Sequence, residues 1–140
     1  MKARIKWVEN ACLMAEAESG HGVVIDGAPE IGGRNLGIRP MEMVLMGLGG
    51  CTAMDVLSIL KKQRQQVTDC VIEVEGQRRD EIPKIFTEIH VRFVITGREL
   101  KEVHVKRAVE LSAEKYCSVS AMLDKTAQIT HEYQIVEELV

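Results

Sequence analysis

The sequence has no strong excess of charge of either sign. Its 18 basic and 21 acidic residues nearly balance, and they form neither a basic stripe nor a basic tail. Because proteins that bind nucleic acid concentrate positive charge on one surface, we do not expect nucleic acid as a partner. The first residues, Met1 to Trp7, also lack the apolar segment of a secretory signal and are typical of a strand. We therefore expect a cytoplasmic protein.

The sequence also lacks the spacings that hold metal ions. Its cysteines are widely separated, at Cys12, Cys51, Cys70 and Cys117. They form no Cys-x-x-Cys pair, so neither a zinc knuckle nor a thioredoxin-type motif is present. In a reducing compartment they begin as free thiols, and any disulfide would be transient. The histidines show no ligand spacing either, and the sequence predicts no metal site.

One long apolar stretch dominates the chain, from Pro40 to Lys62. Pro40 suits the first turn of a helix, and the lysines at the other end suit the negative end of a helix dipole. No charge lies between Glu42 and Asp55, but this uncharged run is too short for a membrane span. A helix that is apolar on nearly every face must be covered on nearly every face. One small sheet covers only one side, so we predict that the same helix of a second copy covers the other.

Three glycines, Gly47, Gly49 and Gly50, stand close together inside this helix. Each costs about 1 kcal/mol relative to alanine in a helix interior, so the cluster indicates either a close backbone approach or a bend. Cys51 follows directly. If the glycines break the helix, Cys51 begins a fresh helical segment whose free N–H groups stabilise a thiolate. Otherwise it is a small buried hydrophobe, as most free cysteines are.

The remaining elements follow from alternating and helical apolar patterns. Strands are expected at 3–7, 11–18, 23–25, 70–75, 84–95 and 127–135, and helices at 100–116 and 119–124. The strands at 70–75 and 84–95 are typical of an antiparallel hairpin. The order of elements predicts a single α+β domain over residues 1–140, an antiparallel sheet wrapped around a long central buried helix.

A glycine-rich loop at 26–39 precedes the central helix. Long loops are often functional, and this one brings Arg34 and Arg39 close to the helix. The alternative is that both arginines are solvated surface charges.

Cys117 extends the inward row of the helix at 100–116, and Ser118 is a plausible N-cap for the next helix. Cys51 and Cys117 thus both lie on inward helical rows, beside points where a helix breaks or ends. Such a pair suits peroxide reduction, in which one thiolate becomes a sulfenic acid and the second thiol condenses with it. The attacking thiol must be ionised, and Arg34 and Arg39 are local candidates for lowering its pKa.

Two segments resemble the OsmC/Ohr family of osmotically inducible and organic hydroperoxide resistance proteins. One is Pro40-Met41-Glu42-(x8)-Cys51 with Gly-Gly before the cysteine, and the other is Glu-Lys-Tyr-Cys-Ser-Val-Ser around Cys117. The resemblance covers essentially the whole chain. It implies an intertwined homodimer whose central helices pack together. It also implies that Cys51 attacks the peroxide and Cys117 resolves, and that dithiols of small or lipoyl type reduce the pair without metal, flavin or other cofactor.

The hydroperoxidases of that family carry a glutamate one residue after the proline, where this chain has Met41. Glu42 is offset by one residue, which rotates it by about 100° on a helix. With Arg34 and Arg39, Glu42 completes the candidates for stabilising the thiolate. The leading hypothesis is thiol-dependent reduction of organic hydroperoxides.

Two other interpretations stay open. The protein could be a non-catalytic binding or redox-sensing module that holds a hydrophobic small molecule in the dimer cleft. Alternatively, Cys51 and Cys117 could be too far apart ever to meet.

Overall fold

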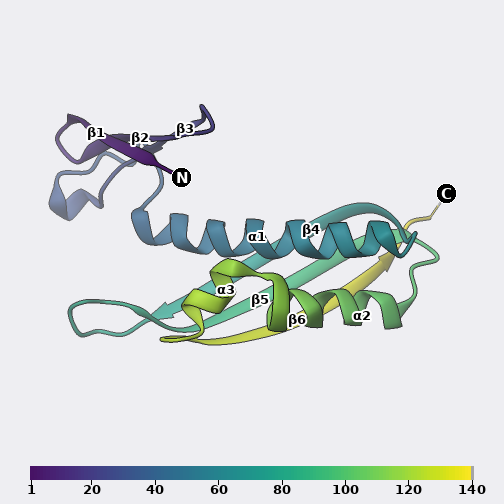
Figure 1. Cartoon of the computed structure of the whole chain (residues 1–140). Coiled ribbons are helices and arrows are strands. Elements are labelled where there is room, and N and C mark those ends of the chain that lie inside the picture. The colour runs from purple at the N-terminus through teal and green to yellow at the C-terminus, as the bar shows by residue number, and fades with distance from the viewer. Residues whose placement is uncertain (140) are drawn as a thin grey trace. The chain divides into compact units, whose positions relative to one another are not determined.

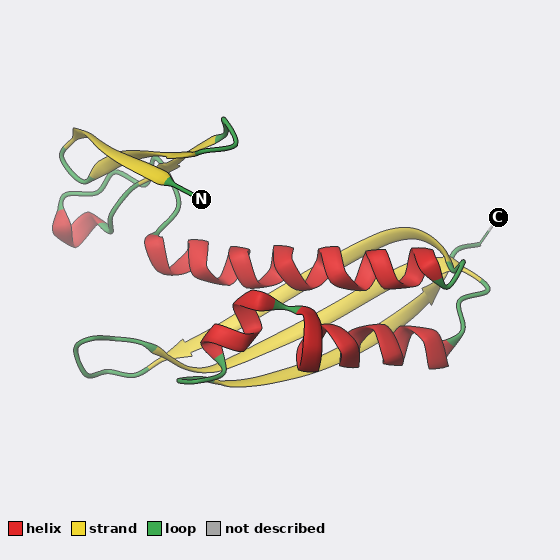
Figure 2. Cartoon of the chain, in the orientation of Figure 1, coloured by secondary structure: helices red, strands yellow, loops and turns green. Residues whose placement is uncertain are grey.

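The computed structural model describes residues 1–139, which form two compact units. The first unit comprises Met1–Val44, and the second begins at Leu45. Helix α1 (Pro40–Lys62) starts in the first unit and continues into the second, with the bounds that the sequence predicts. Over these residues the chain forms two three-stranded sheets and three α-helices (Figures 1 and 2). The predicted α+β class is confirmed.

The N-terminal unit contains an antiparallel meander of three strands. These strands are β1 (Ala3–Glu9), β2 (Cys12–Ala17) and β3 (Gly22–Ile25). The alternating pattern in the first strand predicts a half-buried face, yet every residue of β1 is exposed in the single chain. The apolar side of β1, with Ile5 and Trp7, is therefore left without a cover.

The glycine-rich loop of this unit is organised by one buried carboxylate. Asp26 is only 1% exposed and accepts hydrogen bonds from the backbone N–H groups of Gly27, Arg34 and Leu36 at 2.8, 3.1 and 3.0 Å. These bonds, that of Leu36 foremost, lower the pKa of Asp26 against the opposing effect of burial. A short 3₁₀ turn, η1 (Pro29–Ile31), completes the loop, and backbone hydrogen bonds such as that from Gly33 N–H to Ala28 O hold it together with those to Asp26.

The C-terminal unit contains the second sheet, formed by β4 (Gln66–Arg78), β5 (Phe86–Arg98) and β6 (Gln128–Glu137). The first two strands pair antiparallel, as the sequence predicts. The last strand pairs parallel to β5, which the strand pattern alone does not indicate. The reason is the long connection between them, because parallel neighbours require a crossover and here the crossover is helical.

That crossover carries α2 (Glu102–Leu111), the π-helical turn η2 (Ser112–Tyr116) and α3 (Ser118–Leu123). Together with α1, these helices lie over one face of the sheet (Figure 1). The sheet contributes Ile89, Val91, Phe93 and Ile95 to the core, all at most 1% exposed.

Helix α1 is continuous, so the interpretation in which the glycines break it is wrong. Cys51 therefore lies in the helix interior, where the backbone offers no free N–H groups. A Cβ at Gly49 would come within 3.1 Å of Val74 Cγ2, whereas one at Gly47 or Gly50 would meet nothing within 4 Å. Of the three glycines, only Gly49 therefore lets another element approach α1 closely, and that element is β4 of the same unit.

A single chain covers only one stripe of α1. Its buried residues are Leu48, Gly49, Thr52, Val56 and Leu60. On the other faces of α1, Met46 is 57% exposed and Met54 is 75% exposed. By length and composition alone, α1 would also suit a membrane span. Its buried stripe, however, packs in the core of the C-terminal unit. Coverage of the remaining face by a second copy stays a prediction.

Candidate functional site

The structure brings Cys51 and Cys117 together. Their sulfur atoms and a carboxylate oxygen of Asp55 all lie within 4.8 Å of one another. Both cysteines are free thiols, Cys117 buried and Cys51 partly exposed. The interpretation in which these two cysteines are too far apart to meet is therefore wrong, whereas their catalytic roles stay predictions.

Two elements of the C-terminal unit position the three side chains. Cys51 and Asp55 are four residues apart on α1, which places them one turn apart on the same face. Cys117 follows the π-helical turn η2 in an extended conformation and is the N-cap residue of α3. Its Sγ accepts a hydrogen bond from the backbone N–H of Ser120 at 3.4 Å. The expectation that Ser118 is the N-cap is wrong, because the thiol itself takes that role.

A chain of hydroxyl groups orients the carboxylate of Asp55. Ser112 Oγ donates to Asp55 Oδ2 at 3.1 Å and lies 2.7 Å from Thr52 Oγ1. Because the single hydroxyl proton of Ser112 goes to Asp55, Thr52 is the donor in the second bond. Both hydroxyl residues are at most 1% exposed. This arrangement ties α1 to the end of α2 beside the thiols.

Sequence reasoning missed both Asp55 and Ser112. Asp55 is the first charge after the uncharged run and stands one helical turn beyond Cys51, so this spacing could have identified it. Ser112 falls in the inward row of the predicted helix at 100–116, but the sequence does not indicate that its hydroxyl meets Asp55.

The buried thiol has an altered acidity. Burial raises the pKa of Cys117 to about 11, the Ser120 N–H opposes this rise, and the neighbouring Cys51 and Asp55 add to it. Cys117 is therefore protonated near neutral pH. Such a group can supply a proton or a thiol to chemistry at the neighbouring sulfur.

An open groove of about 380 Å³ runs beside this cluster. Its lining is Asp55, Ser58, Ile59, Lys62, Gln63, Leu111 and Tyr116. The groove combines apolar side chains with one cation, Lys62. A wall of this kind suits a small organic molecule with a polar end.

The other candidate site residues have local partners within the N-terminal unit. Arg34 Nη2 forms an ion pair with Glu9 Oε1 at 2.6 Å. Arg39 Nη1 donates to Asn35 Oδ1 at 3.1 Å, and the backbone N–H of Arg39 donates to Glu42 Oε1 at 2.7 Å. The last bond is one half of a capping box at the start of α1. A role of Arg34, Arg39 and Glu42 in stabilising a thiolate stays a prediction.

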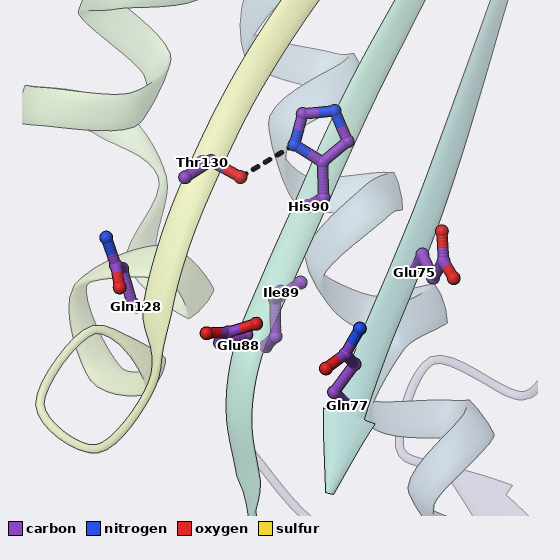
Figure 3. Close-up of a pocket in the computed structure, with 7 residues that line it drawn as sticks. All are labelled: Glu75, Gln77, Glu88, Ile89, His90, Gln128 and Thr130. Carbon is purple, nitrogen blue, oxygen red and sulfur yellow. Dashed lines mark hydrogen bonds between the residues drawn. The ribbon is translucent and has the colours of Figure 1, made fainter.

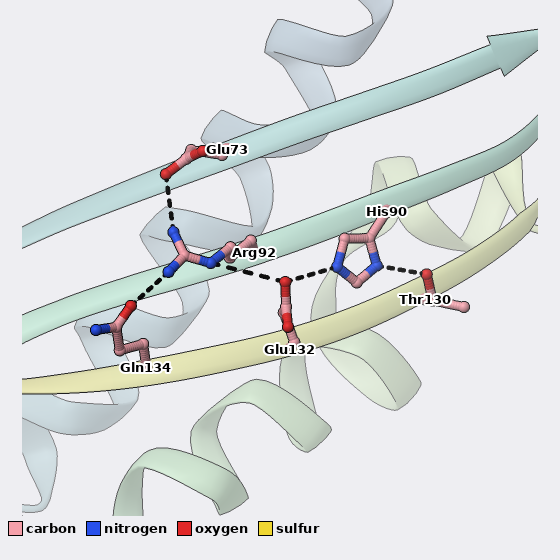
Figure 4. Close-up of polar contacts among 6 residues, drawn as sticks. All are labelled: Glu73, His90, Arg92, Thr130, Glu132 and Gln134. Carbon is pink, nitrogen blue, oxygen red and sulfur yellow. Dashed lines mark hydrogen bonds and ion pairs between the residues drawn. The ribbon is translucent and has the colours of Figure 1, made fainter.

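The solvent-facing side of the second sheet carries a separate hollow of about 250 Å³ (Figure 3). Polar side chains from all three strands line it, without a thiol among them. His90 borders this hollow and bonds to Thr130 at 2.6 Å and to Glu132 at 2.9 Å. Arg92 continues the row toward Glu73 (Figure 4). These contacts pair exposed polar side chains on neighbouring strands. We therefore do not assign the functional site to this face of the sheet.

Comparison with known proteins places the chain in a family. The profile of the OsmC-like protein family matches residues 32–132, and the chain belongs to this family. It is 51% identical over 139 residues to Protein YhfA of Escherichia coli, a match that covers 97% of this chain and 98% of that protein.

Solved structures show the same fold. A hypothetical protein from Aquifex aeolicus is 32% identical, with a TM-score of 0.86 over 99% of this chain and 97% of its own. A Legionella pneumophila protein described as an organic hydroperoxide resistance protein OsmC and predicted redox protein superposes with a TM-score of 0.72. That alignment covers 95% of each chain at 17% identity and shows the fold alone.

Proposed function

We propose that this protein reduces organic hydroperoxides with its own thiols, Cys51 attacking the peroxide and Cys117 resolving. The observation that carries the proposal is the approach of the two sulfurs within 4.8 Å, one partly exposed and one buried. The groove beside Asp55 supports it by offering an apolar wall to the organic part of a substrate. Family membership, with organic hydroperoxide resistance proteins among the structural neighbours, supports it further.

In the first step the Cys51 sulfur attacks the outer oxygen of the hydroperoxide. The O–O bond breaks, sulfur is oxidised to sulfenic acid, and the departing alkoxide takes a proton and leaves as an alcohol. The thiol proton of Cys51 must be lost before or during the attack. Asp55 is the nearest proton acceptor in the cluster, and its hydrogen bond from Ser112 holds it in place.

In the second step Cys117 attacks the sulfenic sulfur of Cys51. An S–S bond forms and water leaves, its oxygen coming from the peroxide and its second hydrogen from the Cys117 thiol. An external dithiol then reduces this disulfide by thiol–disulfide exchange and is itself oxidised. The cycle therefore consumes one hydroperoxide and one dithiol, and it yields one alcohol, one water and one oxidised dithiol.

The decisive experiment measures turnover of cumene hydroperoxide with a lipoyl-type dithiol. Cys51→Ser should abolish turnover, and Cys117→Ser should stop after one oxidation with a sulfenic acid that dimedone traps. Cys70→Ser serves as the matched control, because Cys70 lies on β4 outside the cluster, and it should turn over like the wild type. Absence of wild-type turnover with every dithiol tested would refute the proposal.

A redox-sensing thiol pair is the second candidate, and one observation favours it. Asp55 helps to raise the pKa of Cys117, and a resolving thiol that stays protonated near neutral pH favours slow closure of the cycle. A sensor would be oxidised once by peroxide and would accumulate the 51–117 disulfide even with excess dithiol present. Rapid return to the reduced form with continued peroxide loss would instead support the reductase.

We also propose a homodimer, with cytoplasmic residence. The exposed apolar residues of α1 and β1 support the assembly, because a single chain leaves both faces without cover.

A further inference from the structure

We propose that Cys51, Asp55 and Cys117 also form a binding site for a divalent cation of the zinc class. Two thiols and a carboxylate converge within 4.8 Å, although they come from two different helical elements. Thiolate sulfur together with carboxylate oxygen is a donor set that Zn²⁺ accepts. The sequence gives no hint of it, since the ligands fall outside every short spacing motif.

The separations fit a tetrahedral ion. With Zn–S near 2.3 Å and Zn–O near 2.1 Å, ligand atoms around one ion lie roughly 3.6–3.8 Å apart. The side chains here must close by about 1 Å at the longest separation, which small side-chain rotations can supply. Three protein ligands leave a fourth position for water. The groove along Asp55 offers a path by which an ion and that water can enter.

Neighbouring groups already hold two of the ligands. Ser112 donates to Asp55 Oδ2, which orients the carboxylate while its oxygens keep further lone pairs for an ion. The backbone N–H of Ser120 donates to Cys117 Sγ, a contact that suits a metal-bound thiolate. Outer contacts of this kind fix ligand orientation and tune affinity.

Metal binding and peroxide reduction would use the same two sulfurs. An ion bound there converts both thiols to thiolate ligands, releases their protons to solvent, and withholds the sulfurs from peroxide. The binding itself does not require that the protein reduce peroxide. It is therefore measured on reduced protein in the absence of any oxidant, and its failure would leave the proposed reductase activity untouched.

The test titrates reduced, chelator-treated full-length protein with Co²⁺ and follows absorption. We expect one equivalent to give thiolate-to-cobalt charge-transfer bands together with the intense visible bands of tetrahedral cobalt, and Zn²⁺ to displace them. Cys51→Ser and Cys117→Ser should each weaken binding by about 100-fold or more. Ser112→Ala, which removes the hydrogen bond that orients the carboxylate but leaves all three ligands in place, should weaken it about 10-fold.

Cys70→Ser is the control and should bind as the wild type does, since that thiol lies outside the cluster. Circular dichroism confirms that each variant is folded. Protection of the partly exposed Cys51 from iodoacetamide by Zn²⁺ in the wild type gives a readout that needs no variant. Wild-type protein without thiolate bands, or binding that survives Cys51→Ser unchanged, would overturn the proposal.

Discussion

The Cys117 thiol is buried, so its environment differs strongly from that of a thiol in water. Its pKa is raised to about 11, chiefly by burial. In metal-free, reduced protein we expect its alkylation rate to rise about tenfold per pH unit from pH 7 to 10, because only the thiolate reacts. Mass spectrometry of the Cys117 peptide after timed exposure to iodoacetamide measures this profile.

The pH profile of a variant at Cys51 provides the comparison for the wild-type profile. Cys51→Ala removes a neighbour that raises the pKa of Cys117, so its rate curve should shift to lower pH. A wild-type curve that levels off at the ordinary thiol value of about 8.5 would contradict the expectation.

Individual site residues were predictable only where the sequence itself carries the pattern. The inward rows of two helices indicated Cys51 and Cys117. The carboxylate between them was missed because it looks like one more surface charge until the helix is paired with the turn after α2. The carboxylate of Glu42 accepts the backbone N–H of Arg39 at the start of α1, a capping contact that was not predicted from the sequence, and its role at a thiolate stays a prediction.

At the scale of elements, the contact between α1 and the end of α2 includes two hydrogen bonds of one buried hydroxyl. Ser112 is fully buried and bonds both Thr52 and Asp55. Ser112→Ala should lower the free energy of unfolding by about 1–3 kcal/mol, because it leaves a buried donor and a carboxylate without their partner. Denaturant unfolding of the two proteins at one pH provides the measurement.

Ser58→Ala is the matched change on the exposed side of α1. It should stay within about 0.5 kcal/mol of the wild type. If both substitutions lowered the free energy of unfolding equally, the buried hydroxyl of Ser112 would make no special contribution to stability.

Most elements could be predicted because their apolar periods are strong. The bounds of α1 match, and the core face of β5 is the one that the alternation indicates. Near the hairpin end, an irregularity in pairing between Gln77 and Arg78 accompanies the burial of Phe86 in place of Thr87. The direction of β6 could not be read from its residues, because pairing direction follows from the path of the chain and not from side-chain alternation.

At the scale of the whole molecule, the apolar surface of α1 predicts self-association. We expect a solution mass of twice 15.6 kDa, measured by sedimentation equilibrium. Met54→Glu should weaken the dimer at least tenfold, because a charge would be buried without a partner where an exposed methionine now stands.

Val103→Glu adds the same charge at an exposed apolar position on α2 and is the comparison. It should leave the dimer intact if α1 is the contact. A wild-type protein that sediments at the mass of one chain would rule out the assembly.

The capping role of Cys117 has a consequence beyond its own chemistry. Its sulfur accepts a hydrogen bond from the Ser120 amide, and any new bond to that atom, covalent or coordinate, changes the charge on the sulfur and so the strength of that hydrogen bond. A change at Cys117 therefore alters a backbone hydrogen bond in the first turn of α3. The hydrogen-exchange rate of the Ser120 amide should therefore differ between the reduced, the oxidised and the metal-bound thiol pair.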